Sequence, residues 1–324
     1  MKKLLSIVLA ALLVLGLTAC GQKPAELTEA RVYVLSGPTG IGAVNMMKAA
    51  ENGETEGKYN FNVVAKPDEI VAKISKGEAD IAAVATNLAA KLYNKTNGGV
   101  TVLAVNTLGV LNVLTNSGTT VTSLADLKDK TVYTTGQGSN PEYIIDYLFN
   151  NNGINPDSDL NLQFKAEGTE LVGVWATDPN AVIIAPQPVA TSIVAKYAGS
   201  KIAIDLTDEW EKLNNGSALM QGCVIVRNEF LKNNGATVEK FLEEYEASIN
   251  AANTNVDTSA ALCEEYGIVA KAALAKKAIP GCNICFVSGK EMKTKLSGFL
   301  SVMLAADAAS VGGKLPADDF YYEK

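Results

Sequence analysis

The arrangement of apolar segments along the chain is the feature that most constrains its fold. Short apolar runs of strand length, such as residues 31–35 and 81–85, alternate with segments in which apolar residues recur at helical spacing, such as 70–74. Strands connected through helices of this length must lie parallel, with right-handed crossovers. The sequence therefore predicts an α/β protein whose sheets are mostly parallel and carry helices on both faces.

A loose internal repeat, displaced by 100 residues, indicates two such units. Val32-Tyr33 precedes a glycine-rich turn that begins at Ser36, and Val132-Tyr133 precedes another that begins at Gly136. The order of helix, acidic residue and strand before residue 84 also recurs before residue 185. We therefore predict two similar α/β lobes.

Two further β-rich runs, residues 109–115 and 220–226, separate the lobes, and we interpret them as hinge strands, one leaving the first lobe and one returning to it. The chain from residue 230 to 322 is expected to be mainly helical and to pack on the first lobe. The predicted division is a signal peptide at 1–19, a tether at 20–28, a discontinuous first lobe at 29–109 and 228–324, and a second lobe at 110–227.

The N-terminus has the pattern of an exported protein. Lys2 and Lys3 precede an apolar segment, 4–16, that is too short for a stable membrane-spanning helix. Leu17-Thr18-Ala19-Cys20 resembles the lipobox of bacterial lipoproteins. That resemblance implies that Cys20 becomes the lipidated N-terminus and anchors the protein on the outer face of the bacterial cell membrane. The alternative is an ordinary signal peptide with an incidental cysteine.

Composition excludes several classes of function. Hydrophobic residues make up 48% of the chain and charged residues 19%, which indicates a folded protein, and the net charge of −7 argues against nucleic-acid binding. There is no histidine, which removes Ser-His-Asp and Cys-His catalysis and the commonest zinc ligand. Arginine occurs only at Arg31 and Arg227. We predict no catalytic residue, no metal and no cofactor, and hence no enzyme.

Four cysteines follow Cys20, namely Cys223, Cys263, Cys282 and Cys285. An exported chain allows disulfides, and the last two could close a tight loop. Two more specific interpretations are a thioredoxin-like redox pair at Cys282 and Cys285 and a four-cysteine zinc site. The redox pair is disfavoured because this C-x-x-C motif precedes no βαβ unit. We expect either a structural disulfide or buried free thiols, and the sequence does not decide between them.

Candidate ligand-binding residues lie in five turns that the pattern places at the carboxyl ends of strands. Ligands bind there in open parallel sheets, because helix N-termini present backbone N–H groups. Tyr143 in the first turn of a helix is added as an aromatic that could stack on a ligand. No dinucleotide or Walker motif is present. The predicted residues are Ser36, Gly37, Pro38, Thr39, Gly40, Thr86, Asn87, Thr107, Leu108, Gly109, Gln137, Gly138, Ser139, Asn140, Tyr143 and Gln187.

Three phrases carry a resemblance to a known family: Gly77-Glu78-Ala79-Asp80-Ile81-Ala82, Ser123-Leu124-Ala125-Asp126-Leu127-Lys128 and Ala185-Pro186-Gln187-Pro188. With the ending from Gly312 to Tyr322, they resemble the solute-binding lipoproteins of ABC importers for thiamine-type pyrimidines, aliphatic sulfonates, taurine and nitrate, in a Gram-positive branch. That family has the periplasmic-binding-protein type II fold.

The resemblance implies a monomeric two-lobed clamshell that captures a small polar solute, closes by rotation about the hinge strands, and delivers the solute to an ABC permease and ATPase complex. Relatives often carry an acidic residue where this chain has Gln187, which weakens the argument for a cationic ligand there. No arginine lies between residues 110 and 220, which disfavours an amino-acid ligand. The alternatives are a surface sensor or partner-binding clamshell and, less favoured, an enzyme on the same fold.

Overall fold

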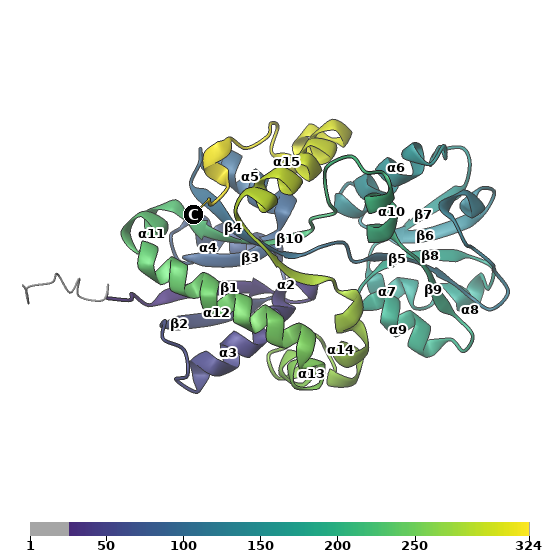
Figure 1. Ribbon diagram of the computed structural model, residues 1–324. Coiled ribbons are helices and arrows are strands. Elements are labelled where there is room, and N and C mark those ends of the chain that lie inside the picture. The colour runs from purple at the N-terminus through teal and green to yellow at the C-terminus, as the bar shows by residue number, and fades with distance from the viewer. Residues whose placement is uncertain (1–25, 324) are drawn as a thin grey trace, which may run out of the picture.

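The computed structural model describes residues 26–323, which form two sheets, each flanked by helices. Figure 1 shows the two sheets in separate lobes, with β5 and β10 running into the region between them. The predicted signal peptide, Cys20 and most of the tether lie outside the described residues. None of the helices formed by residues 26–323 has the length and apolar character needed to cross a membrane.

The first sheet has six strands in the order β11-β4-β10-β3-β1-β2. It is built from both ends of the chain, because β10 and β11 come from its C-terminal part. The strands are β1 (Ala30–Leu35), β2 (Tyr59–Val64), β3 (Ile81–Ala85), β4 (Val100–Thr107), β10 (Gly222–Arg227) and β11 (Ile284–Val287), and the early helices are α2 (Pro38–Ile41), α3 (Val44–Glu51), α4 (Pro67–Ser75) and α5 (Thr86–Lys95).

The second sheet has five strands in the order β7-β6-β8-β5-β9. It is formed by one continuous stretch of chain. The strands are β5 (Leu111–Thr115), β6 (Thr131–Thr135), β7 (Asn161–Lys165), β8 (Val182–Pro186) and β9 (Lys201–Asp205), and the helices are η1 (Leu124–Leu127), α6 (Asn140–Asn151), α7 (Gly168–Leu171), α8 (Val174–Thr177), α9 (Val189–Lys196) and α10 (Leu206–Lys212).

The C-terminal part is mainly helical, as predicted. Figure 1 shows the long helix α12 lying across the first lobe beside α3, and α15 lying between α5 and the second lobe. Its elements besides β11 are α11 (Asn228–Asn233), α12 (Gly235–Thr254), α13 (Val256–Glu265), α14 (Ala272–Ala278), η2 (Ile279–Gly281), α15 (Gly289–Ala306), η3 (Ala308–Val311) and η4 (Asp318–Phe320).

The internal repeat is a structural repeat. In the first sheet Val32 lies opposite Phe61 and Ile81, and in the second sheet Val132, 100 residues later, lies opposite Leu162 and Val182. The strand orders β2-β1-β3-β10-β4 and β7-β6-β8-β5-β9 also correspond one to one. Two similar α/β lobes are therefore confirmed.

The sheets are mixed in a regular way. Four of the six strands of the first sheet run in one direction, and β10 and β11 oppose them. In the second sheet β5 opposes the other four strands. The strand directions are therefore mostly parallel as expected. An opposing strand lies inside each sheet, β10 beside β3 and β5 beside β8, and the first sheet has a second opposing strand, β11, at its edge.

The expected hinge strands differ from those of the structure. Residues 222–227 are β10, which lies inside the first sheet between β3 and β4, so the first lobe already begins again before residue 227. The reason is burial: Val224 and Val226 face one core cluster, and Cys223 and Ile225 face the other. An apolar run that is covered on both faces is a central strand and not a linker.

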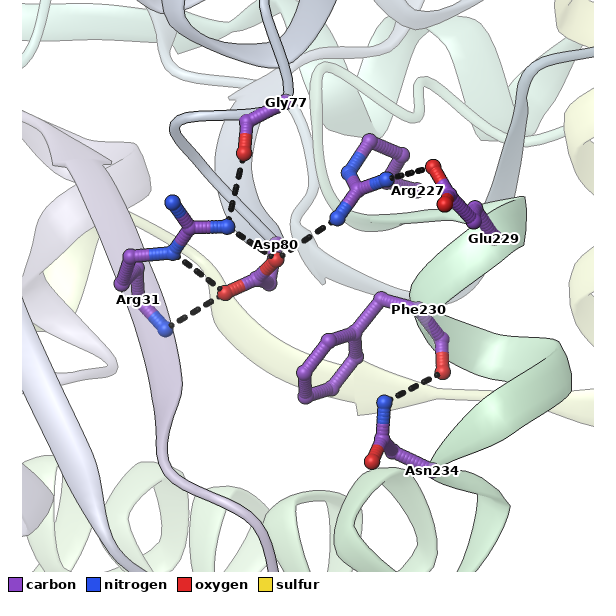
Figure 2. A network of polar contacts seen from close by, with 7 residues as sticks. All are labelled: Arg31, Gly77, Asp80, Arg227, Glu229, Phe230 and Asn234. Carbon is purple, nitrogen blue, oxygen red and sulfur yellow. Dashed lines mark hydrogen bonds and ion pairs between the residues drawn. The ribbon is translucent and has the colours of Figure 1, made fainter.

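The only two arginines of the sequence clamp one buried carboxylate, that of Asp80 (Figure 2). Nη2 of Arg31 lies 2.7 Å from Oδ1 of Asp80 and its Nε 2.8 Å from Oδ2, while Nη2 of Arg227 lies 3.0 Å from Oδ1. Arg31 also donates to the carbonyl of Gly77, and Arg227 also pairs with Glu229. Burial alone would raise the pKa of the Asp80 carboxyl, but the hydrogen bonds from Arg31 and Arg227 and the charge of Arg31 together hold that pKa below its ordinary value.

We predict that Asp80→Ala lowers the free energy of unfolding by about 3 kcal/mol, because it leaves two guanidinium groups without their shared partner. Urea unfolding at pH 7 measures this. Glu78→Ala is the control, since it removes an exposed ion pair with Lys73 and should cost less than about 1 kcal/mol. Equal losses in the two variants would contradict the clamp.

The same carboxyl has a defined pH dependence. Because its folded-state pKa is depressed, its contribution to stability is present above the unfolded-state pKa of about 3.9 and is lost as the pH falls through the lower folded-state pKa. We expect the stability difference between wild type and Asp80→Ala to shrink below about pH 4, as measured by urea unfolding across a pH series.

Candidate functional site

The carboxyl ends of the two sheets face each other because the chain crosses between them over a short distance. β4 ends at Thr107 and β5 begins at Leu111. Gly222 lies opposite both Ala85 and Thr107, and Leu111 lies opposite Pro186. The turns after β1, β3 and β4 therefore belong to the same region as the turns after β6 and β8, which is where the sequence predicted a ligand.

The first-lobe loop, residues 36–40, is held from several sides. The N–H of Gly37 donates to the carbonyl of Ile268 over 2.8 Å, and φ of Gly37 is +92°. A side chain at Gly40 would place its Cβ 2.3 Å from the carbonyl oxygen of Leu35. Ser36, Gly37, Pro38 and Thr39 are half-buried, and Gly40 is buried. This loop is a rigid rim at the end of β1.

A buried amide that the sequence did not single out supports that rim. Nδ2 of Asn106 donates to the carbonyl of Thr39 over 3.0 Å and to the hydroxyl of Tyr245 over 2.8 Å. Asn106 is 1% exposed. Its only sequence signal is an amide near the end of an otherwise apolar strand.

Several of the residues predicted to contact a ligand instead form hydrogen bonds or pack inside the protein. The hydroxyl of Thr86 donates to the carbonyl of Met220 over 2.7 Å, and that of Thr107 donates to Oδ1 of Asn106. Gly109 is packed so closely that a Cβ there would lie 2.2 Å from Oγ1 of Thr207. These three residues are buried, whereas Asn87 and Leu108 are half-buried. The buried residues shape the crossing, and their side chains offer no free group to a ligand.

Two amides that sequence reasoning missed hold the crossing backbone from opposite sides. Oε1 of Gln221 accepts the N–H of Val110 over 2.8 Å, and the N–H of Gln221 donates to the carbonyl of Thr107. Nδ2 of Asn283 donates to the carbonyl of Gly109 over 2.7 Å. Asn283 lies between the two cysteines of a C-x-x-C motif and Gln221 in no motif, and neither position signals this role, because each amide finds its partner only through tertiary contact.

The second-lobe loop, residues 136–140, is organised by the first turn of α6. The carboxylate of Glu142 accepts the N–H of Gly138, and the hydroxyl of Tyr143 lies 3.2 Å from the Gly138 carbonyl oxygen. The same hydroxyl donates to Oδ2 of Asp307 over 2.8 Å. Burial and then this carboxylate raise the pKa of Tyr143 to about 12. Gln137 and Gly138 are exposed, and Ser139 and Asn140 are half-buried.

Gln187 is buried, not open to the region between the lobes. Its Oε1 accepts from the hydroxyl of Thr191 over 2.7 Å, and it is 3% exposed. A Cβ built on Gly281 would lie 3.0 Å from its Nε2, so the C-terminal segment covers it. Gln187 therefore forms part of a contact between the second lobe and η2.

The predicted turns themselves are uncharged. The arginines lie at the opposite edge of the first sheet, and the five predicted turns contain no lysine. On α6, burial raises the pKa of Asp146 to about 6, with smaller contributions from Glu142 and Asp157. A groove of about 770 Å³ lies beside it, lined by Glu142, Tyr143, Asp146, Tyr147 and Asn150 of α6 and by Ser301, Val302, Ala305 and Ala306 of α15.

The four cysteines after Cys20 are free thiols, which decides between the two expectations left open by the sequence. Burial raises the pKa of Cys263, Cys282 and Cys285 to about 12 in each case. Such thiols stay protonated and unreactive at neutral pH. Within residues 26–323 no group of His, Cys, Asp or Glu side chains is arranged to hold a metal ion.

Comparisons with known proteins agree with this architecture. A family model described as NMT1/THI5 like matches residues 60–258, which is more than half of the chain. A solved structure described as an ABC transporter from Parabacteroides distasonis is 26% identical, with a TM-score of 0.76, and the match covers 92% of this chain and 99% of that one. A search of curated protein sequences finds no match.

Two further solved structures share the fold. The periplasmic aliphatic sulphonate binding protein SsuA from Escherichia coli is 12% identical, with a TM-score of 0.71 and coverage of 92% of this chain and 93% of that one. The alkanesulfonate-binding protein SsuA from Xanthomonas axonopodis, bound to MOPS, is 11% identical, with a TM-score of 0.62 and coverage of 90% and 96%. The fold is thus that of the type II periplasmic binding proteins, a two-lobed clamshell.

We predict that Asn106→Ala destabilises the protein by about 1–3 kcal/mol, because it leaves the Thr39 carbonyl and the Tyr245 hydroxyl without their buried donor. Tyr245→Phe, which removes only one of these partners, should cost less. Thermal unfolding compares the two. A cost for Tyr245→Phe that equals or exceeds that of Asn106→Ala would refute the role assigned to Asn106.

Asp146 provides a pH prediction of opposite sign to that of Asp80. Its folded-state pKa of about 6 is raised, so the folded protein binds this proton more tightly than the unfolded chain does. Its effect is to lower stability as the pH rises from about 4 through about 6. Asp146→Asn should therefore raise the free energy of unfolding at pH 7.5 by about 1–2 kcal/mol, with solvent screening allowed for, and by much less at pH 4.

Urea unfolding at the two pH values tests this, with Asp157→Asn as the control. Asp157 is exposed and acts on Asp146 only through like-charge repulsion, so its removal should stabilise by a few tenths of a kcal/mol. A gain for Asp146→Asn that is the same at both pH values would contradict the assigned pKa.

Proposed function

Because the chain belongs to the NMT1/THI5-like family, we propose that it is an extracytoplasmic solute-binding protein that captures a small polar molecule between its lobes and delivers it to an ABC importer. The observation that carries the proposal is the match to the Parabacteroides distasonis ABC transporter structure, which extends over 92% of this chain and 99% of that one. The facing carboxyl ends of the two sheets would provide the place where a solute binds. This role requires no reaction, and we propose no catalytic residue.

The proposed mechanism is hinge closure. The lobes are joined through residues 108–110 and the segment that returns to β10, and a solute that contacts both lobes favours the closed arrangement. The proposed contacts are the turn residues that keep exposed or half-buried polar groups, namely Ser36, Thr39, Asn87, Gln137, Ser139 and Asn140. Oδ1 of Asn140 is buried and has no hydrogen-bond partner within residues 26–323, which supports a ligand contact at this position.

The solute is held without an arginine clamp. Both arginines are engaged by Asp80, so an anionic head group would depend on backbone N–H groups and neutral side chains at the turns. Sulfonates are the ligands named for the two SsuA structures, and the glycines at 37, 138 and 136 permit close backbone approach here as well. Sulfonates, nitrate, taurine and neutral pyrimidines are therefore the solutes to test first.

The remaining parts of the proposal concern location and partners. We propose that Cys20 is lipidated and that residues 20–28 tether a monomeric protein to the outer face of the cell membrane, where it meets the permease and ATPase complex. The basis is the lipobox sequence Leu17-Thr18-Ala19-Cys20. Mass spectrometry of the protein extracted from its native membrane would detect the lipid on Cys20.

We predict that one solute class raises the melting temperature of a protein that starts at Gly21 by several degrees when present at about 100 times its dissociation constant. Thermal shift against sulfonates, taurine, nitrate, pyrimidines and vitamins measures this, and solution scattering should show compaction with the same solute.

Asn140→Ala should weaken binding about tenfold, whereas Asn161→Ala should not, because Asn161 is exposed at the amino end of β7, the opposite end of the second sheet's parallel strands. A solute that binds without compaction, or that is turned over, would argue against this mechanism.

A further inference from the structure

Helix α15 joins the two lobes through a polar contact at its C-terminal end. Asp307, which follows α15, accepts the N–H of Ala309 over 2.8 Å and so caps η3. η3 is fastened to α5 of the first lobe, where Nδ2 of Asn94 donates to the carbonyl of Val311 over 2.8 Å. Asp307 is therefore fixed on the first lobe, while its partner Tyr143 is on α6 of the second lobe.

A second contact between α15 and the second lobe is apolar. The rings of Trp210 and Phe299 lie 5.6 Å apart, and the ring of Tyr147 lies 4.7 Å from that of Trp210. Trp210 and Phe299 are fully buried. Between this contact and Tyr143 lies the groove of about 770 Å³, so α6 and α15 do not pack along their whole facing surfaces. Tyr143, which lines this groove, forms a polar contact with the end of α15 that is separate from the ring contact, and we call it the outer tie.

The outer tie also touches the second-lobe loop. The hydroxyl of Tyr143 lies 2.8 Å from Oδ2 of Asp307 and 3.2 Å from the carbonyl oxygen of Gly138, and the neighbouring Glu142 accepts the Gly138 N–H. One tyrosine hydroxyl therefore contacts the loop at the end of β6 and a carboxylate of the opposite lobe. A change in the angle between the lobes must move one of these contacts relative to the other.

We propose that the Tyr143–Asp307 pair is a latch between the lobes. It holds the ligand-free protein at one interlobe angle and transmits movement of that angle to the loop at residues 136–140. Tyr143, which the sequence suggested as a stacking partner for a ligand, is on this view a positioning residue. The latch concerns the free protein, so its test does not depend on the identity of the solute.

The test compares Tyr143→Phe with Tyr266→Phe. Tyr266 donates to Glu51 over 2.8 Å, the same distance as in the latch, but both of these residues belong to the first lobe. Hydrogen–deuterium exchange and solution scattering of the ligand-free variants measure loop order and interlobe opening. We expect residues 136–143 to exchange about tenfold faster in Tyr143→Phe, with a larger radius of gyration, and neither change in Tyr266→Phe.

Asp307→Asn provides the second variant. An asparagine still caps η3, because its side-chain oxygen can accept the Ala309 N–H, but it removes the charge from the latch. It should give a smaller change of the same kind, because the amide can still donate its Nδ2–H to the Tyr143 hydroxyl while that hydroxyl donates to the Gly138 carbonyl. The double variant should exchange no faster than Tyr143→Phe alone. Unchanged exchange and scattering in Tyr143→Phe, or the same changes in Tyr266→Phe, would overturn the latch.

Discussion

β10 is inserted between β3 and β4, and its antiparallel direction fixes where the second lobe can lie. The chain leaves the first sheet at the carboxyl end of β4. It must return at that same end of the sheet, because β10 runs antiparallel to β3 and β4. The whole second lobe is therefore built from the chain between these two strands. Since β5 begins only a few residues after β4, the second sheet has to present its own carboxyl edge to the first. The facing of the carboxyl ends of the two sheets is thus a consequence of one strand's position.

Polar side chains form hydrogen bonds with the backbone groups of the segment between β4 and β5, where the strand ladders end. Gln221 and Asn283 take the N–H of Val110 and donate to the carbonyl of Gly109, groups that leave the ladder at this point. Buried backbone groups need such partners, since an unpaired one costs as much as a lost hydrogen bond. The hydroxyls of Thr86 and Thr107 serve the same region. Part of the polar character of the strand ends therefore serves the hinge, and only the remainder is available to a solute.

Charge is distributed unevenly between the two ends of the molecule. The arginines and Asp80 form their ion pairs at the amino ends of the parallel strands of the first sheet, the ends that do not face the second sheet (Figure 2). Carboxylates lie near the loop after β6 instead: Glu142 accepts the N–H of Gly138 in this loop, and Asp307 accepts from the hydroxyl of Tyr143. The predicted binding loop and a contact between the lobes therefore share the first turn of α6.

Apolar periodicity and strand length in the sequence predict the two α/β lobes, because both reflect burial within a lobe, and the offset of 100 residues between Val32 and Val132 reappears in the strand register. The turns at the strand ends follow from the same pattern. Long-range contacts place β10 inside the first sheet, bury Thr86 and Gln187, and give Asn106, Gln221 and Asn283 their partners at the ends of the strands. The partners of these polar groups lie up to 174 residues away, and no local pattern records such distant pairs.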